Sequence, residues 1–255
     1  MATYKKRGGK PRTKEEQQSE LEKNSTTAEV FRSLDEGASR TEAWIQKNQK
    51  VLLGAFGVIA LAVVGYFVFQ EFVQNPKEAE AMSEMSQAQN YWEEALNITE
   101  KDSLYNLALH GGGGKYGFLD IIDNYGGTDA ANLSHYYVGI AYLNMNKYKE
   151  AIEHLDKFKS KDEILAPIAK GSIGDAFTNL GQHEDALKYY EDAASMRTND
   201  FTTPRFLFKA GLTALNLNKI DKAKKHFEKI VKDYPNSEEF AKAEVYLGRT
   251  EAMTK

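Results

Sequence analysis

The chain has 255 residues, a formal net charge of −4, and shares of charged (27%) and hydrophobic (42%) residues that are ordinary for a folded protein. Residues 1–50 carry 11 Lys or Arg and 8 Asp or Glu, whereas residues 71–255 carry 22 and 29. The larger part is therefore acidic, which argues against a nucleic-acid partner, because neutralising phosphates requires clustered Lys and Arg. The absence of cysteine excludes disulfides, thiol catalysis and thiolate metal sites.

The first 50 residues divide into two predicted segments. Residues 1–24 are polar and almost free of apolar side chains, which predicts a disordered basic cytoplasmic tail. Residues 25–50 are predicted to form a cytoplasmic amphipathic helix, because a capping box of Thr26 and Glu29 precedes apolar residues that recur near one face. This helix either lies on the membrane or contacts a partner, or it is a weakly packed solvated helix.

Residues 51–73 are predicted to be a transmembrane helix. From Val51 to Phe69 the chain has 19 residues without a charge or an amide. As a helix this run is roughly 29 Å long, close to the ~30 Å hydrocarbon core of a bilayer, and it is too long for the apolar part of a signal peptide. Small residues recur every three positions along it, at Gly54, Gly57 and Ala60. They either let another membrane helix approach closely or reflect how common Gly and Ala are in membrane spans.

Basic residues around this run predict its orientation. Four Lys or Arg lie in the 20 residues before it and one, Lys77, in the 20 after it. Because cytoplasmic flanks carry the excess of Lys and Arg, the N-terminus is expected in the cytoplasm and residues 74–255 outside. In a bacterium this is a single-pass inner-membrane protein with a periplasmic domain.

Three stretches after the span share one pattern, namely YYVGIAYLNMNKYKEAIEHL (136–155), GSIGDAFTNLGQHEDALKYY (171–190) and FKAGLTALNLNKIDKAKKHF (208–227). Each has a glycine in its first helix, an alanine 12 residues later, and a large apolar residue four residues after the alanine. The glycines are Gly139, Gly174 and Gly211, and a fourth in the same series is Gly248. The pattern resembles the tetratricopeptide repeat, a helix-turn-helix unit of about 34 residues.

The sequence therefore predicts an all-α fold, a single N-terminal transmembrane helix followed by a tetratricopeptide-repeat solenoid over residues 74–255. The predicted parts are a divergent repeat 76–127, repeats 132–160, 167–196 and 204–235, and a C-terminal capping helix 237–253. In the divergent repeat, the run HGGGGK is expected to connect a helix over residues 76–98 to one over residues 116–125.

That glycine run is not predicted to bind a nucleotide. A P-loop needs a glycine five residues before the Gly-Lys pair and Ser or Thr after the lysine, whereas Leu109 and Tyr116 stand at these places. The glycines are expected to let the connection turn, because Gly accepts positive φ without strain. The five histidines are scattered in sequence, and neither an HExxH pair nor a GxSxG elbow occurs. No catalytic, cofactor or metal site is therefore predicted, and the chain is expected not to be an enzyme.

The first helix of each repeat lines the concave face of such a solenoid. The predicted partner-binding residues on it are Tyr136, Ile140, Leu143, Asn144, Ser172, Asp175, Asn179, Lys209, Leu212 and Asn216. The three asparagines recur at one repeat position. They either hydrogen-bond the backbone of an extended peptide or end the helix before a turn, and the second interpretation is preferred.

A basic cytoplasmic segment, one membrane span and a periplasmic tetratricopeptide domain together resemble the YfgM-like family. The resemblance extends from about Phe31 to the C-terminus, and its most telling stretch is LALHGGGGKYGFLDIIDNYGGTDAANLSHYYVGIAYLNM. It implies an ancillary subunit of the SecYEG translocon that associates with a PpiD-like periplasmic chaperone and meets exported polypeptides. The alternative is an envelope scaffold that organises an outer-membrane or cell-wall assembly independently of the translocon.

Overall fold

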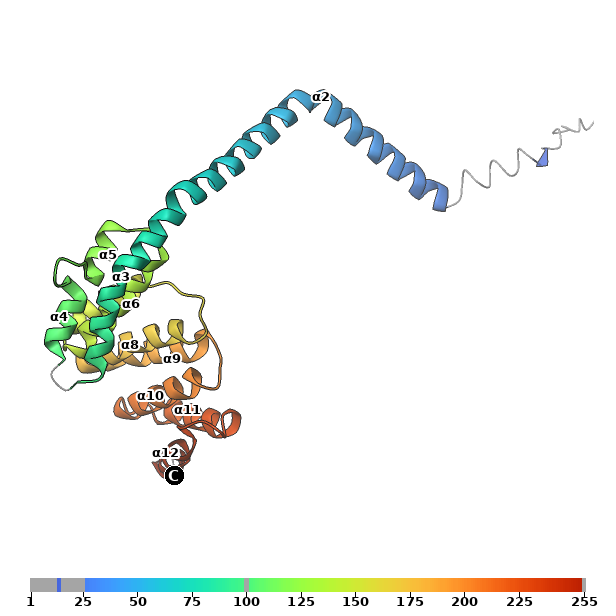
Figure 1. The fold of residues 1–255 in the computed structure, drawn as a ribbon. Helices are drawn as coiled ribbons and strands as arrows, with labels where there is room; N and C mark the ends of the chain where they lie inside the picture. Colours follow the sequence, from blue (N-terminus) through green and yellow to red (C-terminus); the bar gives the residue numbers. More distant parts are fainter. Residues whose placement is uncertain (1–12, 15–25, 99–100, 254–255) are drawn as a thin grey trace, which may run out of the picture. The chain divides into compact units, whose positions relative to one another are not determined.

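The computed structural model describes residues 13–14, 26–98 and 101–253, and it divides into two compact units, residues 1–69 and 70–255. Of the predicted tail, residues 1–24, only residues 13–14 are among the described residues. The side chains of the predicted capping box, Thr26 and Glu29, also lie outside what is described. The first unit contains α2 (Thr26–Phe69). The second contains a π-helical segment η1 (Gln70–Gln74) and then α3 (Asn75–Leu96), α4 (Asp102–His110), α5 (Phe118–Asn124), α6 (Asp129–Asn144), α7 (Tyr148–Lys157), α8 (Leu165–Asn179), α9 (His183–Met196), α10 (Thr202–Asn216), α11 (Ile220–Asp233) and α12 (Phe240–Met253) (Figure 1). Throughout the described ranges the secondary structure is helical apart from one isolated bridge, which confirms the all-α prediction.

Helix α2 is a single helix of 44 residues that contains both the predicted amphipathic helix and the apolar run. The apolar side chains from Val51 to Phe69 are nearly all exposed, with Leu61 reaching 74%. By length and composition, the described helices include one that is able to cross a membrane, and it contains this run. Side chains on Gly54 and Gly57 would meet no atom within 4 Å, so this part of α2 offers open small positions.

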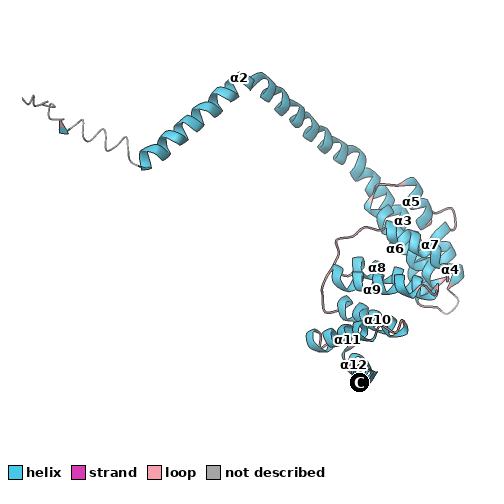
Figure 2. Cartoon of the chain, turned by 180° about the vertical axis from the view of Figure 1, so that it is seen from behind, coloured by secondary structure: helices cyan, strands magenta, loops and turns pink. Residues whose placement is uncertain are grey.

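The repeats form the packed helix pairs that the sequence predicts. Helix α6 packs on α7, α8 on α9, and α10 on α11, while α12 packs on α11. Figure 2 shows α8 with α9, α10 with α11, and then α12 following one another toward the C-terminus. Helix α8 also contacts α6 and α10, so the first helices of successive repeats are neighbours.

A glycine marks the crossing of the two helices in every complete repeat. A Cβ on Gly139 would lie 2.4 Å from Leu155 Cγ, and one on Gly174 would lie 2.7 Å from the Tyr190 ring. The equivalent distance from Gly211 to the Phe227 ring is 2.6 Å. The large residue that follows each alanine by four positions therefore sits directly on the glycine, where any side chain would displace it.

The region before the first clear repeat has three helices rather than the two expected. The additional helix is α4, and its Tyr105, Ala108 and Leu109 are fully buried in the same cluster as residues of α3, α5 and α6. The glycine run thus connects α4 to α5 and does not connect the two predicted helices directly. This places one more helix against the first clear repeat.

The glycines of HGGGGK shape a tight loop, as the sequence predicts. Gly111, Gly113 and Gly114 all have positive φ, at 79°, 63° and 77°. A Cβ on Gly111 would lie 2.1 Å from the Lys115 carbonyl oxygen, whereas Cβ atoms on Gly113 and Gly114 would meet nothing within 4 Å. The base of the loop is therefore sterically closed, and its tip is open.

The start of the second unit is tied to the N-terminus of α6 by three side chains. Glu78 accepts hydrogen bonds from the backbone N–H groups of Asp129 (2.6 Å) and Ala130 (2.9 Å), which satisfies donors left open at a helix start. Gln74 and Lys77 donate to two carbonyl oxygens in the loop before α6, each at 2.8 Å. These bonds hold α3 in place against the repeats.

Candidate partner-binding site

The ten residues predicted to bind a partner lie on α6, α8 and α10, which are neighbouring helices. The asparagines are exposed, and six others are half-buried: Tyr136, Ile140, Leu143, Asp175, Lys209 and Leu212. Ser172 is buried, at 8% exposure, so it offers little surface to a partner. We call the nine accessible residues (Tyr136, Ile140, Leu143, Asn144, Asp175, Asn179, Lys209, Leu212 and Asn216) the first-helix face.

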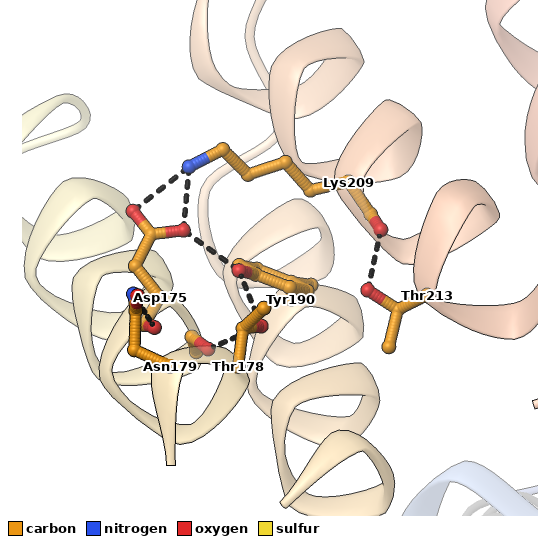
Figure 3. Close-up of polar contacts among 7 residues, drawn as sticks. Asp175, Thr178, Asn179, Tyr190, Lys209 and Thr213 are labelled. Carbon is orange, nitrogen blue, oxygen red and sulfur yellow. Dashed lines mark hydrogen bonds and ion pairs between the residues drawn. The ribbon is translucent and has the colours of Figure 1, made fainter. Parts of the chain in front are cut away.

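A polar network occupies the centre of this face (Figure 3). The Lys209 ammonium donates to both carboxylate oxygens of Asp175, at 2.6 and 2.8 Å, and the Tyr190 hydroxyl donates to one of them at 2.7 Å. The Thr178 hydroxyl lies 3.0 Å from the Tyr190 hydroxyl and donates to the Gly174 carbonyl oxygen. The network thus joins α8, α9 and α10, and two of its side chains, Asp175 and Lys209, belong to the predicted site.

The Asp175–Lys209 pair leaves the centre of the face polar but without net charge. Each of the two side chains is 30% exposed. Lys209 also lies over the rings of Tyr190 (5.6 Å) and Phe206 (6.0 Å), which are favourable positions for a cation. Burial, with the neighbouring Asp175 carboxylate, raises the pKa of Tyr190, so its hydroxyl remains a donor at neutral pH.

The recurring asparagines are the last residues of their helices. Asn144 and Asn179 each donate from Nδ2 to the carbonyl oxygen four residues earlier, at 2.9 Å. Asn146 and Asn218, which follow α6 and α10, have a φ of 60° and make the turns to the next helix. The geometry therefore supports the helix-ending role for Asn144 and Asn179, since one amide hydrogen of each is already used.

The apolar residues of the face are partly engaged in packing. The Tyr136 ring lies 5.3 Å from the Phe158 ring and 5.8 Å from that of Tyr137. Leu212 packs against the core formed by α9, α10, α11 and α12. Packing therefore fixes the positions of Tyr136 and Leu212 and leaves only part of each side chain accessible to a partner.

Two pockets beside α7 share no residue with the first-helix face and were not predicted. One, of about 440 Å³, is bordered by α7 and by the end of α8, and its lining residues are Lys149, Ile152, Phe177, Leu180 and Gln182. The other, of about 170 Å³, is bordered by α7, α8 and Met196. Phe177 and Leu180 lie within the repeated stretch 171–190, and the repeat period does not indicate a pocket there.

Two histidines that are 19 residues apart in sequence come together between α6 and α7. The Nδ1 atoms of His135 and His154 are 3.1 Å apart, and the ring centroids are 5.1 Å apart. Burial, followed by the neighbouring His154 and Lys157 charges, lowers the pKa of His135 to about 4, and burial also lowers the pKa of His154. Among the described residues, no group of three or more His, Cys, Asp or Glu is placed to hold a metal ion.

Comparison with known proteins gives one family. Residues 105–244, more than half of the chain, match the family model described as "T7SS, ESX-1 secretion system protein EccA1, N-terminal domain". The match begins in α4 and ends in α12, so it contains all three complete repeats and the first-helix face. No curated protein matches the chain. The chain therefore belongs to the family of the EccA1 N-terminal domain.

Proposed function

We propose that this protein is a membrane-anchored, non-enzymatic interaction protein of a protein-export system. The observation that carries the proposal is the first-helix face, where three neighbouring helices carry half-buried apolar side chains and the neutral Asp175–Lys209 pair. Interface centres combine apolar anchors with few uncompensated charges. Tyr136, Leu143 and Leu212 are the anchors we assign to a protein partner.

The proposed location is the bacterial inner membrane, with the apolar part of α2 as a single span. A cytoplasmic N-terminus is part of this proposal, and the four basic residues before the run against one after it support it. The repeat domain is then periplasmic. Gly54, Gly57 and Ala60 are proposed to contact another membrane helix, since a Cβ at either glycine would have open space around it.

The proposed partners are the SecYEG translocon, a PpiD-like periplasmic chaperone and exported polypeptides. Two likenesses support protein export as the setting. The domain arrangement resembles the YfgM-like family, and the family that the chain belongs to takes its description from a secretion-system protein. They name different secretion machines, so the translocon assignment rests on the first likeness.

Cross-linking in native membranes followed by gentle solubilisation tests this proposal. Wild-type protein is expected to bring down the channel and the chaperone. A variant with Tyr136→Ala, Leu143→Ala and Leu212→Ala, and a chain whose span is replaced by an unrelated anchor, are expected to bring down less. A matched control carries Leu96→Ala, Ile98→Ala and Met196→Ala, which are exposed apolar residues away from the face.

Thermal unfolding of both triple variants separates lost binding from lost folding. Recovery of outer-membrane components in place of channel and chaperone would support the envelope-scaffold alternative. Equal recovery with wild type, the face variant and the anchor replacement would show that the partner is right and the assigned residues are wrong.

A further inference from the structure

The larger pocket lies at the junction of the first two complete repeats and is apolar inside. Its walls are Ile152 of α7 and Phe177 and Leu180 at the end of α8, all half-buried. Its rim is formed by Lys149 and Gln182, both exposed. The pocket, of about 440 Å³, is open to solvent on one side, so it is a depression that suits a side chain of a partner rather than an enclosed ligand.

At the junction of the second and third complete repeats, an ion pair spans the position that the pocket occupies at the first junction. Glu184 of α9 corresponds to Lys149 of α7, and Lys219 before α11 corresponds to Gln182 before α9. The Lys219 ammonium lies 2.5 Å from a Glu184 carboxylate oxygen, so an ion pair spans the junction.

Two of the three apolar wall positions are more buried at the second junction, whereas Leu180 and its counterpart Leu217 are both half-buried. Ile152 corresponds to Leu187, which is buried at 2% exposure, while Ile152 itself is half-buried. Phe177 corresponds to Ala214, which is fully buried. At the first junction the apolar surface is therefore left accessible, although the helix pairs repeat.

Among the described residues, the Lys149 ammonium at the rim has no carboxylate partner. Lys149 faces an amide, Gln182, at the place where Lys219 faces the Glu184 carboxylate. Within the described residues the structure gives the Lys149 ammonium no ion pair. A carboxylate from outside is therefore the group that would complete the junction electrostatically.

We propose that this junction is a second protein-binding site, which takes a peptide segment with a large apolar side chain next to a carboxylate. The apolar side chain enters between Ile152, Phe177 and Leu180, and the carboxylate binds the Lys149 ammonium. The Gln182 amide is a neutral hydrogen-bonding group beside them. The site is separate from the first-helix face, because it shares no residue with it.

The residues at the second junction suggest a double variant that should close the pocket. Lys149→Glu with Gln182→Lys reproduces the pair that spans the next junction. Because Glu184 and Lys219 already occupy the equivalent backbone positions, this double variant is expected to fold with an unchanged or slightly raised melting temperature. The matched control is Glu184→Gln with Lys219→Gln, which removes the ion pair at the other junction and leaves the pocket intact.

Ligand-observed NMR with the full chain in nanodiscs detects the weak binding expected of a short peptide. The probes are the peptides Gly-Ser-Glu-Leu-Phe-Ser-Gly and Gly-Ser-Gln-Leu-Phe-Ser-Gly, with empty nanodiscs as the blank. Wild type and the control variant are expected to broaden the Leu and Phe signals of the Glu peptide, and more strongly than those of the Gln peptide. The closed variant is expected to broaden neither, a loss of about tenfold or more in affinity.

Three results would contradict the proposal. Equal broadening by wild type and the closed variant would show that the peptide binds elsewhere, and the absence of broadening with wild type would show that the pocket takes no such segment. Equal broadening of the Glu and Gln peptides by wild type, together with no change in Lys149→Met, would reject the carboxylate and its assignment to Lys149. This experiment does not involve the first-helix face, so a negative result would not contradict the proposed function, which the cross-linking experiment tests separately.

Discussion

The Nδ1 atoms of His135 and His154 lie 3.1 Å apart and link the two helices of the first complete repeat. Two protonated imidazoles at this distance would repel each other, and both rings are partly buried. A neutral pair allows one Nδ1–H to donate to the other Nδ1. Burial and the Lys157 cation oppose protonation of both rings. The Glu153 carboxylate favours protonation of both rings, and the Asp123 carboxylate favours protonation of His154.

We predict that the free energy of unfolding falls as the pH is lowered from about 6.5 toward 4. The pKa of His135 is about 4 in the folded chain against an ordinary value of 6.5, so the unfolded state binds more protons between these values. The contribution is fully present above 6.5 and is lost on acidification. Urea unfolding at about pH 7 and about pH 5 measures it. His135→Gln is expected to reduce the difference between the two pH values.

We predict that Gly139→Leu, Gly174→Leu and Gly211→Leu each lower the free energy of unfolding by about 1–3 kcal/mol, because a side chain there overpacks the helix crossing. Gly248→Leu is the matched control. It stands at the same repeat position in α12, and a Cβ there would meet nothing within 4 Å. Replacing Gly by Leu raises helix propensity by about 0.8 kcal/mol at all four sites. The difference in the free energy of unfolding between each variant and Gly248→Leu therefore measures the cost of overpacking. Equal losses in all four variants would contradict the packing described here.

The repeat register was predictable because it follows from glycine and alanine at fixed spacing, and these residues decide where two helices can approach. Helix α4 was not predicted, for a reason of length. It has 9 residues, and its three buried apolar residues, Tyr105, Ala108 and Leu109, are too few to reveal the 3.6-residue period of a helix. The glycine run after it then directed the interpretation toward one long connection.

The contacts across each helix pair were not predictable from the register, because the same position carries different chemistry in each repeat. His135 and His154 correspond to Lys170 and Tyr189 in the next repeat, where the Lys170 ammonium lies 5.0 Å from the centre of the Tyr189 ring. Backbone spacing is common to both repeats. The contact itself depends on side chains that differ from one repeat to the next, and this also explains why the pocket beside Lys149 was missed.

We predict that Asp175→Ala costs more stability than Lys209→Met. Without Asp175, the buried Tyr190 hydroxyl loses its 2.7 Å acceptor and the Lys209 ammonium loses its counter-ion. The Tyr190 hydroxyl can turn to the Thr178 oxygen at 3.0 Å, so the expected loss is that of a hydrogen bond to a charged group, about 1.5–3 kcal/mol. In Lys209→Met the carboxylate keeps the Tyr190 bond and remains 30% exposed to solvent, so the loss should be smaller. Urea unfolding of both variants ranks them, and the reverse order would show that the cation is the more important partner.

We predict that Gly111→Ala destabilises the glycine loop more than Gly114→Ala does. Both residues have nearly the same positive φ, 79° and 77°, so the conformational strain of adding a side chain is similar. Only at Gly111 would the Cβ meet backbone, at 2.1 Å from the Lys115 carbonyl oxygen. The difference in melting temperature between the two variants therefore measures the closed base of the loop. Equal melting temperatures would mean that the loop relaxes without cost.

The last prediction concerns the orientation of α2 in the membrane. The chain has no cysteine, so single cysteines introduced at Lys14 and at Lys115 report the two sides without further engineering. A membrane-impermeant maleimide is expected to label Lys115→Cys in intact spheroplasts and Lys14→Cys only after lysis, because four basic residues precede the apolar run and one follows it. Replacing Arg40, Lys47 and Lys50 by Ala, together with Glu71→Lys, leaves one basic residue before the run and two after it, and this reversed bias should increase labelling of Lys14→Cys in intact spheroplasts. Labelling of Lys14→Cys but not Lys115→Cys in intact spheroplasts of the unmodified background would reverse the proposed topology and place the repeat domain in the cytoplasm.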